Sequence, residues 1–133
     1  MIRIFYGVFL VLHGLVHLLY LGQSARYFEL QPGMVWPDGA WAFSKLLGNE
    51  TTRMVANILL ALAALVFVGG GVGFLGKQEW WRCAVLSAAA FSTVIYFLLW
   101  DGRFENLANN GWVGILINLI VLGALIWFKW PKI

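Results

Sequence analysis

Four long apolar segments without a single charged side chain constrain this chain more than any other feature. They cover residues 4–22, 54–76, 83–100 and 107–128, and every Asp, Glu, Lys and Arg lies between or outside them. Crossing the hydrocarbon core of a bilayer takes about 20 residues of α-helix. Because backbone groups in lipid must be hydrogen-bonded within the protein, each segment is predicted to be a helix.

The composition points to the same solvent. Of the 133 residues, 62% are apolar and 11% are charged, whereas soluble domains average about 45–50% apolar and about 25% charged. A short soluble chain could not hide that much apolar surface, because small domains bury a smaller fraction of their surface. We therefore predict an all-α, single-domain membrane protein. Its four helices form an up-down-up-down bundle, with a long structured loop over residues 23–53.

The charges outside the segments separate into two groups, one for each side of the membrane. One side carries five basic residues and one acidic residue, namely Arg3, Lys77, Arg82, Lys129, Lys132 and Glu79. The other side carries four basic and five acidic residues. The positive-inside rule then places both termini in the cytoplasm, and we expect a bacterial inner membrane. The basic residues form no run, so a nucleic-acid partner is not expected.

The eight tryptophans agree with these boundaries. All of them fall at the ends of the predicted spans or in the connections between them. Tryptophan prefers the headgroup zone of a bilayer, so the pattern predicts an aromatic belt at both interfaces.

Two histidines lie inside the first segment, four residues apart. His13 and His17 share one helix face with Tyr6 and Tyr20, because residues three or four apart are neighbours on a helix. Polar groups are costly in lipid, so this face should turn toward protein. Two asparagines of other segments lie at a similar predicted depth. We therefore expect a polar cluster made by Tyr6, His13, His17, Tyr20, Asn57 and Asn118.

The cluster has a plain interpretation and a sharper one. The plain interpretation is hydrogen bonding between helices, at about 0.6 kcal/mol per bond. The sharper one makes His13 and His17 cofactor ligands, since histidines at i and i+4 can reach one metal. No carboxylate lies within any span, and Cys83 lies at the opposite membrane face from His17, so no metal site is expected. Haem, a pigment or a quinone stay open as cofactors, although no cofactor is the first expectation.

Charged residues near the third connection suggest a second feature. Asp101, Arg103 and Glu105 lie beside the long first loop, and an ion pair among them is the simplest expectation. We predict that they belong to a folded extracytoplasmic cap. Residues 40–48 are short, apolar and contain a tryptophan, so they should lie at the outer interface. No complete set of catalytic residues is recognised.

The layout resembles that of small bacterial membrane proteins with four spans. The resemblance is carried by "HGLVHLLY", the long first connection, the paired tryptophans before the third segment and the Trp-Asp pair after it. In general layout the chain is also similar to the DoxX-like group of four-helix membrane proteins. That resemblance implies a quinone or redox partner.

Three functional hypotheses follow. The first is a non-enzymatic membrane subunit that packs against membrane lipids, other membrane proteins or itself, within a bioenergetic or redox complex. The alternative is a small redox protein that binds a cofactor, quinone or pigment through His13 and His17. The third is a lipid-handling protein with a pocket between its helices.

Overall fold

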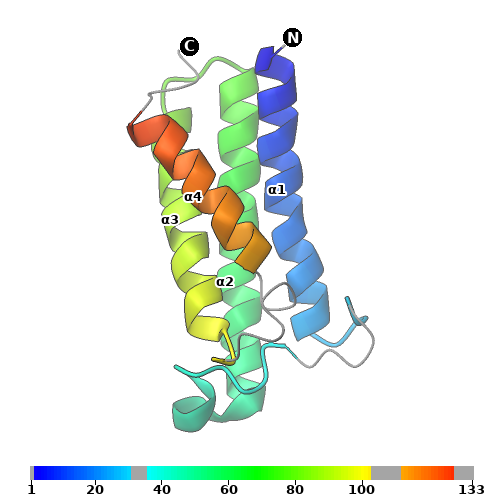
Figure 1. Cartoon of the computed structure of the whole chain (residues 1–133). Coiled ribbons are helices and arrows are strands. Elements are labelled where there is room, and N and C mark those ends of the chain that lie inside the picture. Colours follow the sequence, from blue (N-terminus) through cyan, green and yellow to red (C-terminus); the bar gives the residue numbers. More distant parts are fainter. Residues whose placement is uncertain (1, 31–35, 103–111, 128–133) are drawn as a thin grey trace.

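The computed structural model of the chain describes residues 2–30, 36–102 and 112–127, and these residues form a bundle of four helices. The helices are α1 (Ile2–Ser24), α2 (Ser44–Leu75), α3 (Trp81–Leu99) and α4 (Trp112–Ile126). Figure 1 shows them running alternately in opposite directions, with α4 inclined to the other three. The prediction of an all-α, up-down-up-down bundle is therefore confirmed.

Three of the helices are long and apolar enough to cross a membrane, namely α1, α2 and α3. Their outward faces carry many large apolar side chains, such as Phe5, Leu65 and Val94. These features indicate a membrane protein, as the composition predicted. The fourth helix has 15 described residues. The predicted span 107–128 begins within residues that lie outside the described part of the chain.

Neighbours in sequence are the main packing partners. Among the described residues, α1 packs on α2, α2 on α3 and α3 on α4, whereas α1 and α4 meet only sparsely. The two ends of the bundle differ in what they contain. The turn end holds the start of α1 and the connection between α2 and α3, and the cap end holds residues 24–30, 36–43 and 100–102.

Glycines bring α1 and α2 into close contact. A Cβ atom at Gly14 would lie 2.8 Å from Cβ of Phe67 and 3.1 Å from the backbone nitrogen of Val68. A Cβ atom at Gly71 would lie 3.1 Å from the backbone nitrogen of Val11. Small residues let helix backbones approach each other, which is the main route to tight packing in lipid. By contrast, a Cβ atom at Gly69 would meet no atom within 4 Å.

The second helix begins ten residues before the predicted boundary at residue 54. Residues 44–47 form one helical turn, and the chain then breaks at Gly48, whose φ of 82° and ψ of 160° are not helical. Such a conformation is essentially restricted to glycine, which explains why the helix changes direction there. The hydroxyl of Thr52 donates a hydrogen bond of 2.7 Å to the carbonyl oxygen of Gly48 and closes the following turn.

The core has two apolar parts, one toward each end of the bundle. Toward the turn end it contains the buried side chains of Leu10, Phe74, Trp81, Val85 and Val121, among others. Toward the cap end it contains Trp36, Leu60, Ile95, Tyr96 and Leu99, among others. Four buried polar side chains lie between these two parts: His13, His17, Ser92 and Asn118.

The cap end is closed by part of the first loop. Asp38 pairs with Arg26 at 2.9 Å and with Arg53 at 3.7 Å. Arg26 also donates a hydrogen bond of 3.0 Å to the carbonyl oxygen of Trp36. The loop is also attached to the end of α3, where the indole nitrogen of Trp41 donates a hydrogen bond of 2.7 Å to the carbonyl oxygen of Phe97.

The described tryptophans differ in burial, which corrects the prediction of a belt formed by all eight. Trp36 and Trp81 are buried in the core and cannot face headgroups. Trp41, Trp80 and Trp127 are exposed, as a belt requires. Trp36 lies in the first loop and Trp81 at the start of α3, which are also the kinds of position that the exposed tryptophans occupy, so position along the chain could not identify the buried pair.

We predict that Gly14→Ala destabilises the bundle, whereas Gly69→Ala does not. The added methyl at position 14 meets the backbone of α2, and such overpacking costs about 1–3 kcal/mol. The methyl at position 69 enters open space and replaces glycine by a better helix former. Thermal unfolding of both variants in one detergent measures the difference. Equal losses from the two substitutions would contradict the packing described here.

Candidate functional site

The first helix brings both histidines to the inside of the bundle. His13 and His17 lie one turn apart on the face of α1 that is buried against the other helices, and both are at least 95% buried. The neighbours Leu12, Leu15 and Leu18 point outward and are exposed. The alternation of polar-inside and apolar-outside residues follows from the high cost of placing an imidazole in hydrocarbon.

Four hydrogen bonds form a closed circuit through α1, α3 and α4, and two of them join a histidine to another helix. Nε2 of His13 lies 2.7 Å from Oδ1 of Asn118 on α4. Nδ2 of Asn118 donates to Oγ of Ser92 on α3 at 2.9 Å. Oγ of Ser92 lies 2.6 Å from Nε2 of His17, and Nδ1 of His17 lies 3.0 Å from the carbonyl oxygen of His13. We call these four side chains the polar ring.

The direction of every bond in the polar ring follows from one backbone carbonyl. The carbonyl oxygen of His13 can only accept, so Nδ1 of His17 carries the hydrogen. Neutral His17 therefore has a bare Nε2, which accepts the hydroxyl hydrogen of Ser92. The oxygen of Ser92 in turn accepts from the amide nitrogen of Asn118. The remaining oxygen of Asn118 accepts from Nε2–H of His13.

When both histidines are neutral, the polar ring requires them to be different tautomers. His13 carries its hydrogen on Nε2, and His17 carries its hydrogen on Nδ1. A second hydrogen on His17 would point at the hydroxyl of Ser92 and force that hydroxyl to find another acceptor. Each bond is thus satisfied without any charge in the membrane interior, where an isolated charge is costly.

Aromatic rings enclose the polar ring. Phe67 of α2 contacts both imidazoles, with ring centroids 4.8 Å from that of His13 and 5.2 Å from that of His17. The ring of Tyr96 lies 5.5 Å from that of His17, and the ring of Phe9 stacks on that of His13 at 5.9 Å. All four helices therefore contribute to this one region, three through hydrogen bonds and α2 through Phe67.

The arrangement favours a structural connection between helices over metal binding. Three of the four imidazole nitrogens are used in hydrogen bonds, and His17 could bind a metal through Nε2 only by giving up its bond to Ser92. Within the described residues, no group of three His, Cys, Asp or Glu side chains could hold a metal ion. The chemistry available is hydrogen bonding among α1, α3 and α4.

The structure brings together three of the six residues predicted to form the polar cluster. His13, His17 and Asn118 are joined, but Asn118 bonds to His13 and not to His17. Tyr6 lies toward the turn end, where its ring contacts those of Phe74 and Trp81. Tyr20 lies toward the cap end.

Asn57 is separated from the polar ring by about one helical turn. Val11 lies beside Gly71, and the hydroxyl of Ser24 donates to the carbonyl oxygen of Arg53 at 3.3 Å. This antiparallel register places Asn57 level with the last turns of α1, closer to the cap end than His17. Its buried Oδ1 makes no hydrogen bond within the described residues.

The predicted acidic and basic cap lies mostly outside the described residues. Arg103 and Glu105 belong to the range 103–111, and Asp101 is partly buried at the cap end. The described cap contacts are instead those of Asp38 with Arg26 and Arg53. Sequence reasoning did not select these residues, although the turn signal around Pro37 and Asp38 was visible.

Ser92 and Phe67 belong to the polar region but not to the six residues predicted to form the polar cluster. The sequence places Ser92, with Thr93 and Tyr96, near the midplane of the third segment, which makes it a possible partner of the histidines. Phe67 is one of ten phenylalanines, and nothing in its sequence neighbourhood marks it as the contact of both imidazoles. Depth along the spans therefore points to Ser92, whereas Phe67 follows only from the packing of α2.

Comparison of the chain with protein-family models, with curated proteins and with solved structures found no match. The resemblance to the DoxX-like group therefore stays a prediction from layout.

We predict that Asn118→Leu destabilises the bundle more than Asn57→Leu. Asn118→Leu removes the acceptor of the Nε2–H of His13 and the donor to the hydroxyl oxygen of Ser92. Leaving these buried groups without partners should lower the free energy of unfolding by about 1–2 kcal/mol. Asn57→Leu removes a side-chain amide whose oxygen has no hydrogen bond in the described residues. This substitution should therefore be neutral or stabilising. Thermal unfolding in detergent compares the two. A larger loss from Asn57→Leu would show that the polar ring does not hold the helices.

The tautomers provide an independent test. In bilayers at neutral pH, we expect His13 to be protonated on Nε2 alone and His17 on Nδ1 alone. The ¹⁵N chemical shifts of histidine-labelled protein distinguish protonated from bare ring nitrogens, and His13→Gln assigns the signals. Two identical tautomers, or a doubly protonated ring, would contradict the hydrogen-bond directions.

Proposed function

We propose that the protein is a small, non-enzymatic subunit of a membrane assembly, which binds its partner along the side where α1 and α4 diverge. The groove between these two helices carries the proposal. It has a volume of about 340 Å³ and is lined by Tyr6, Phe9, Ile117, Ile120, Val121 and Ala124. A transmembrane helix of another protein, or a second copy of this chain, would close the bundle there.

The state of the interior supports a non-enzymatic role. The polar ring satisfies its own hydrogen bonds, and Phe9 stacks on His13 next to the groove. The outward face of α4 carries large apolar side chains, with Leu116, Leu119 and Ile120 exposed. Apolar faces of this kind associate in lipid through shape and close packing, because no hydrophobic driving force separates protein from lipid.

The orientation belongs to the same proposal. The turn end carries Arg3, Lys77 and Arg82, while the cap end carries acidic residues beside its basic ones. The positive-inside rule then favours a multi-pass protein of a bacterial inner membrane, with both termini in the cytoplasm.

Cysteine cross-linking tests the partner surface. In a Cys83→Ser background, which removes the chain's single cysteine, we expect Ile120→Cys in native membranes to form a cross-linked species with a partner or with a second copy. The matched control is Leu62→Cys on the exposed face of α2, which should stay uncross-linked. A monomer from both variants, or equal cross-linking from both, would contradict the proposal.

A second candidate function is binding of a quinone, pigment or haem near His13 and His17. The observation that favours it is the apolar lining of the groove and its nearness to His13, since Phe9 both lines the groove and stacks on that imidazole. A visible absorption spectrum and solvent extraction of the purified protein test it. A colourless protein without quinone would remove this candidate and leave the first untouched.

A further inference from the structure

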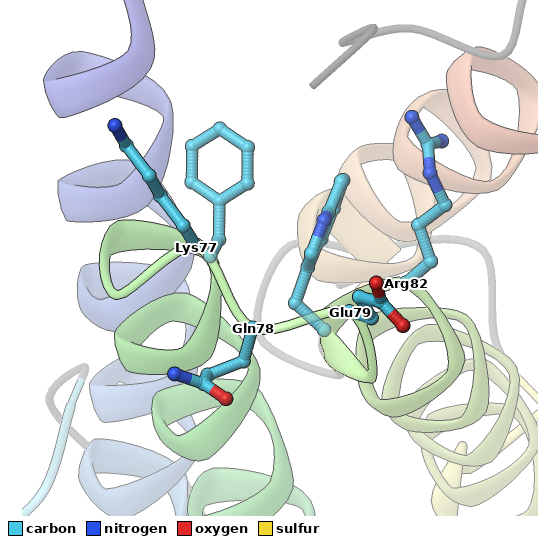
Figure 2. A pocket seen from close by; sticks show the side chains of 6 residues that line it. Lys77, Gln78, Glu79 and Arg82 are labelled. Carbon is cyan, nitrogen blue, oxygen red and sulfur yellow. The ribbon is translucent and has the colours of Figure 1, made fainter.

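A second hollow lies at the turn end, away from the polar ring and the α1–α4 groove. It has a volume of about 430 Å³ and is lined by Phe74, Lys77, Gln78, Glu79, Trp81 and Arg82. Figure 2 shows Lys77 and Arg82 extending toward the same side of the turn, whereas Gln78 points the opposite way. Two cationic side chains therefore flank one concave surface at the end of two membrane-length helices.

The floor of this hollow is aromatic and held in place. The rings of Phe74 and Trp81 meet edge to face at 4.7 Å, and both residues are buried. Arg3 of α1 reaches across and donates to the carbonyl oxygens of Phe74 and Leu75, at 3.3 Å and 2.5 Å. The guanidinium of Arg82 lies 4.8 Å from the ring of Trp81. The hollow is thus a preorganised surface and not a chance gap between flexible chains.

Lys77 occupies a backbone position that usually belongs to glycine. Its φ is 58°, in the left-handed region. The amide of Gln78 bonds to the carbonyl oxygen of Gly73 at 2.8 Å, which closes the end of α2 in a Schellman motif. Glycine is favoured at this position because a Cβ atom is strained there. Glycine would avoid this strain, so the lysine side chain is kept at a conformational cost that its charge at the turn end offsets.

We propose that this hollow binds the phosphate of an anionic phospholipid, with Lys77 and Arg82 as the cationic partners. The charge balance supports a lipid with a net negative charge, because the lining carries two cations against Glu79 alone. The depth supports a lipid over a soluble anion, because the hollow lies beside Trp80, which is half exposed at a helix end as interfacial tryptophans are. Basic pockets at membrane-helix ends bind lipid headgroups in this way.

The test uses the full chain in a zwitterionic detergent and native mass spectrometry. Phosphatidylglycerol and phosphatidylcholine of equal chain length are titrated separately, and we expect the first to bind more tightly. Lys77→Gly should weaken phosphatidylglycerol binding about fivefold, the effect of one cation near a membrane surface. The same substitution should keep or raise the unfolding temperature, because it relieves the left-handed strain. Lost binding can therefore not be attributed to unfolding.

Two further variants sharpen the result. Glu79→Gln should strengthen phosphatidylglycerol binding, because it removes the opposing charge. Lys45→Gln removes an exposed lysine at the other end of the bundle and should leave binding unchanged. Equal binding of the two lipids, undiminished binding by Lys77→Gly, or an equal loss from Lys45→Gln would each overturn the proposal. So would displacement of the lipid by a large molar excess of glycerol phosphate, which would assign the hollow to a soluble phosphate.

Discussion

The bond from Nδ1 of His17 to the carbonyl oxygen of His13 sets the hydrogen-bond pattern inside this bundle. A helix carbonyl is an acceptor that cannot change its role, so the first donor is determined by the backbone of α1 itself. From there each side chain has one arrangement left, and the sequence of donors runs through Ser92 and Asn118 back to His13. In lipid, where water cannot replace a missing partner, such a consistent set is the condition for burying polar groups at all.

The polar ring also explains how an open arrangement of helices holds together. Each helix packs on the next in sequence, and α1 and α4 share little surface. The bond between His13 and Asn118 spans this poorly packed side and connects residues 105 positions apart. The apolar core lies on both sides of it, toward the turn end and the cap end. The hydrogen bond between His13 and Asn118 fixes the distance between α1 and α4 where side-chain packing is sparse. This distance leaves room for the groove between the two helices.

Features that depend on composition and on the helical repeat could be predicted from the sequence, whereas those that depend on local backbone conformation or on the register between helices could not. Helix number, direction and the inward histidine face follow from the absence of charge over about 20 residues and from the helical repeat. The start of α2 was missed because Gly48 joins a short turn to the long helix through a conformation that composition does not reveal. The predicted start of the second span places Asn57 at the membrane depth of His17, which is why the sequence assigns it to the cluster. The actual depth of Asn57 relative to the histidines depends on the register between α1 and α2, and the close contacts at Gly14 and Gly71 determine that register.

The two ends of the bundle differ in a way that bears on function. At the cap end, charges are paired with each other, since Asp38 lies between Arg26 and Arg53. At the turn end, Arg3 is engaged with the last carbonyls of α2, where a cation also balances the negative end of the helix dipole. Lys77 lies just beyond the same helix end, in a left-handed backbone conformation that glycine would adopt without strain. Its charge, beside an aromatic floor and the second cation Arg82, favours a ligand that carries negative charge.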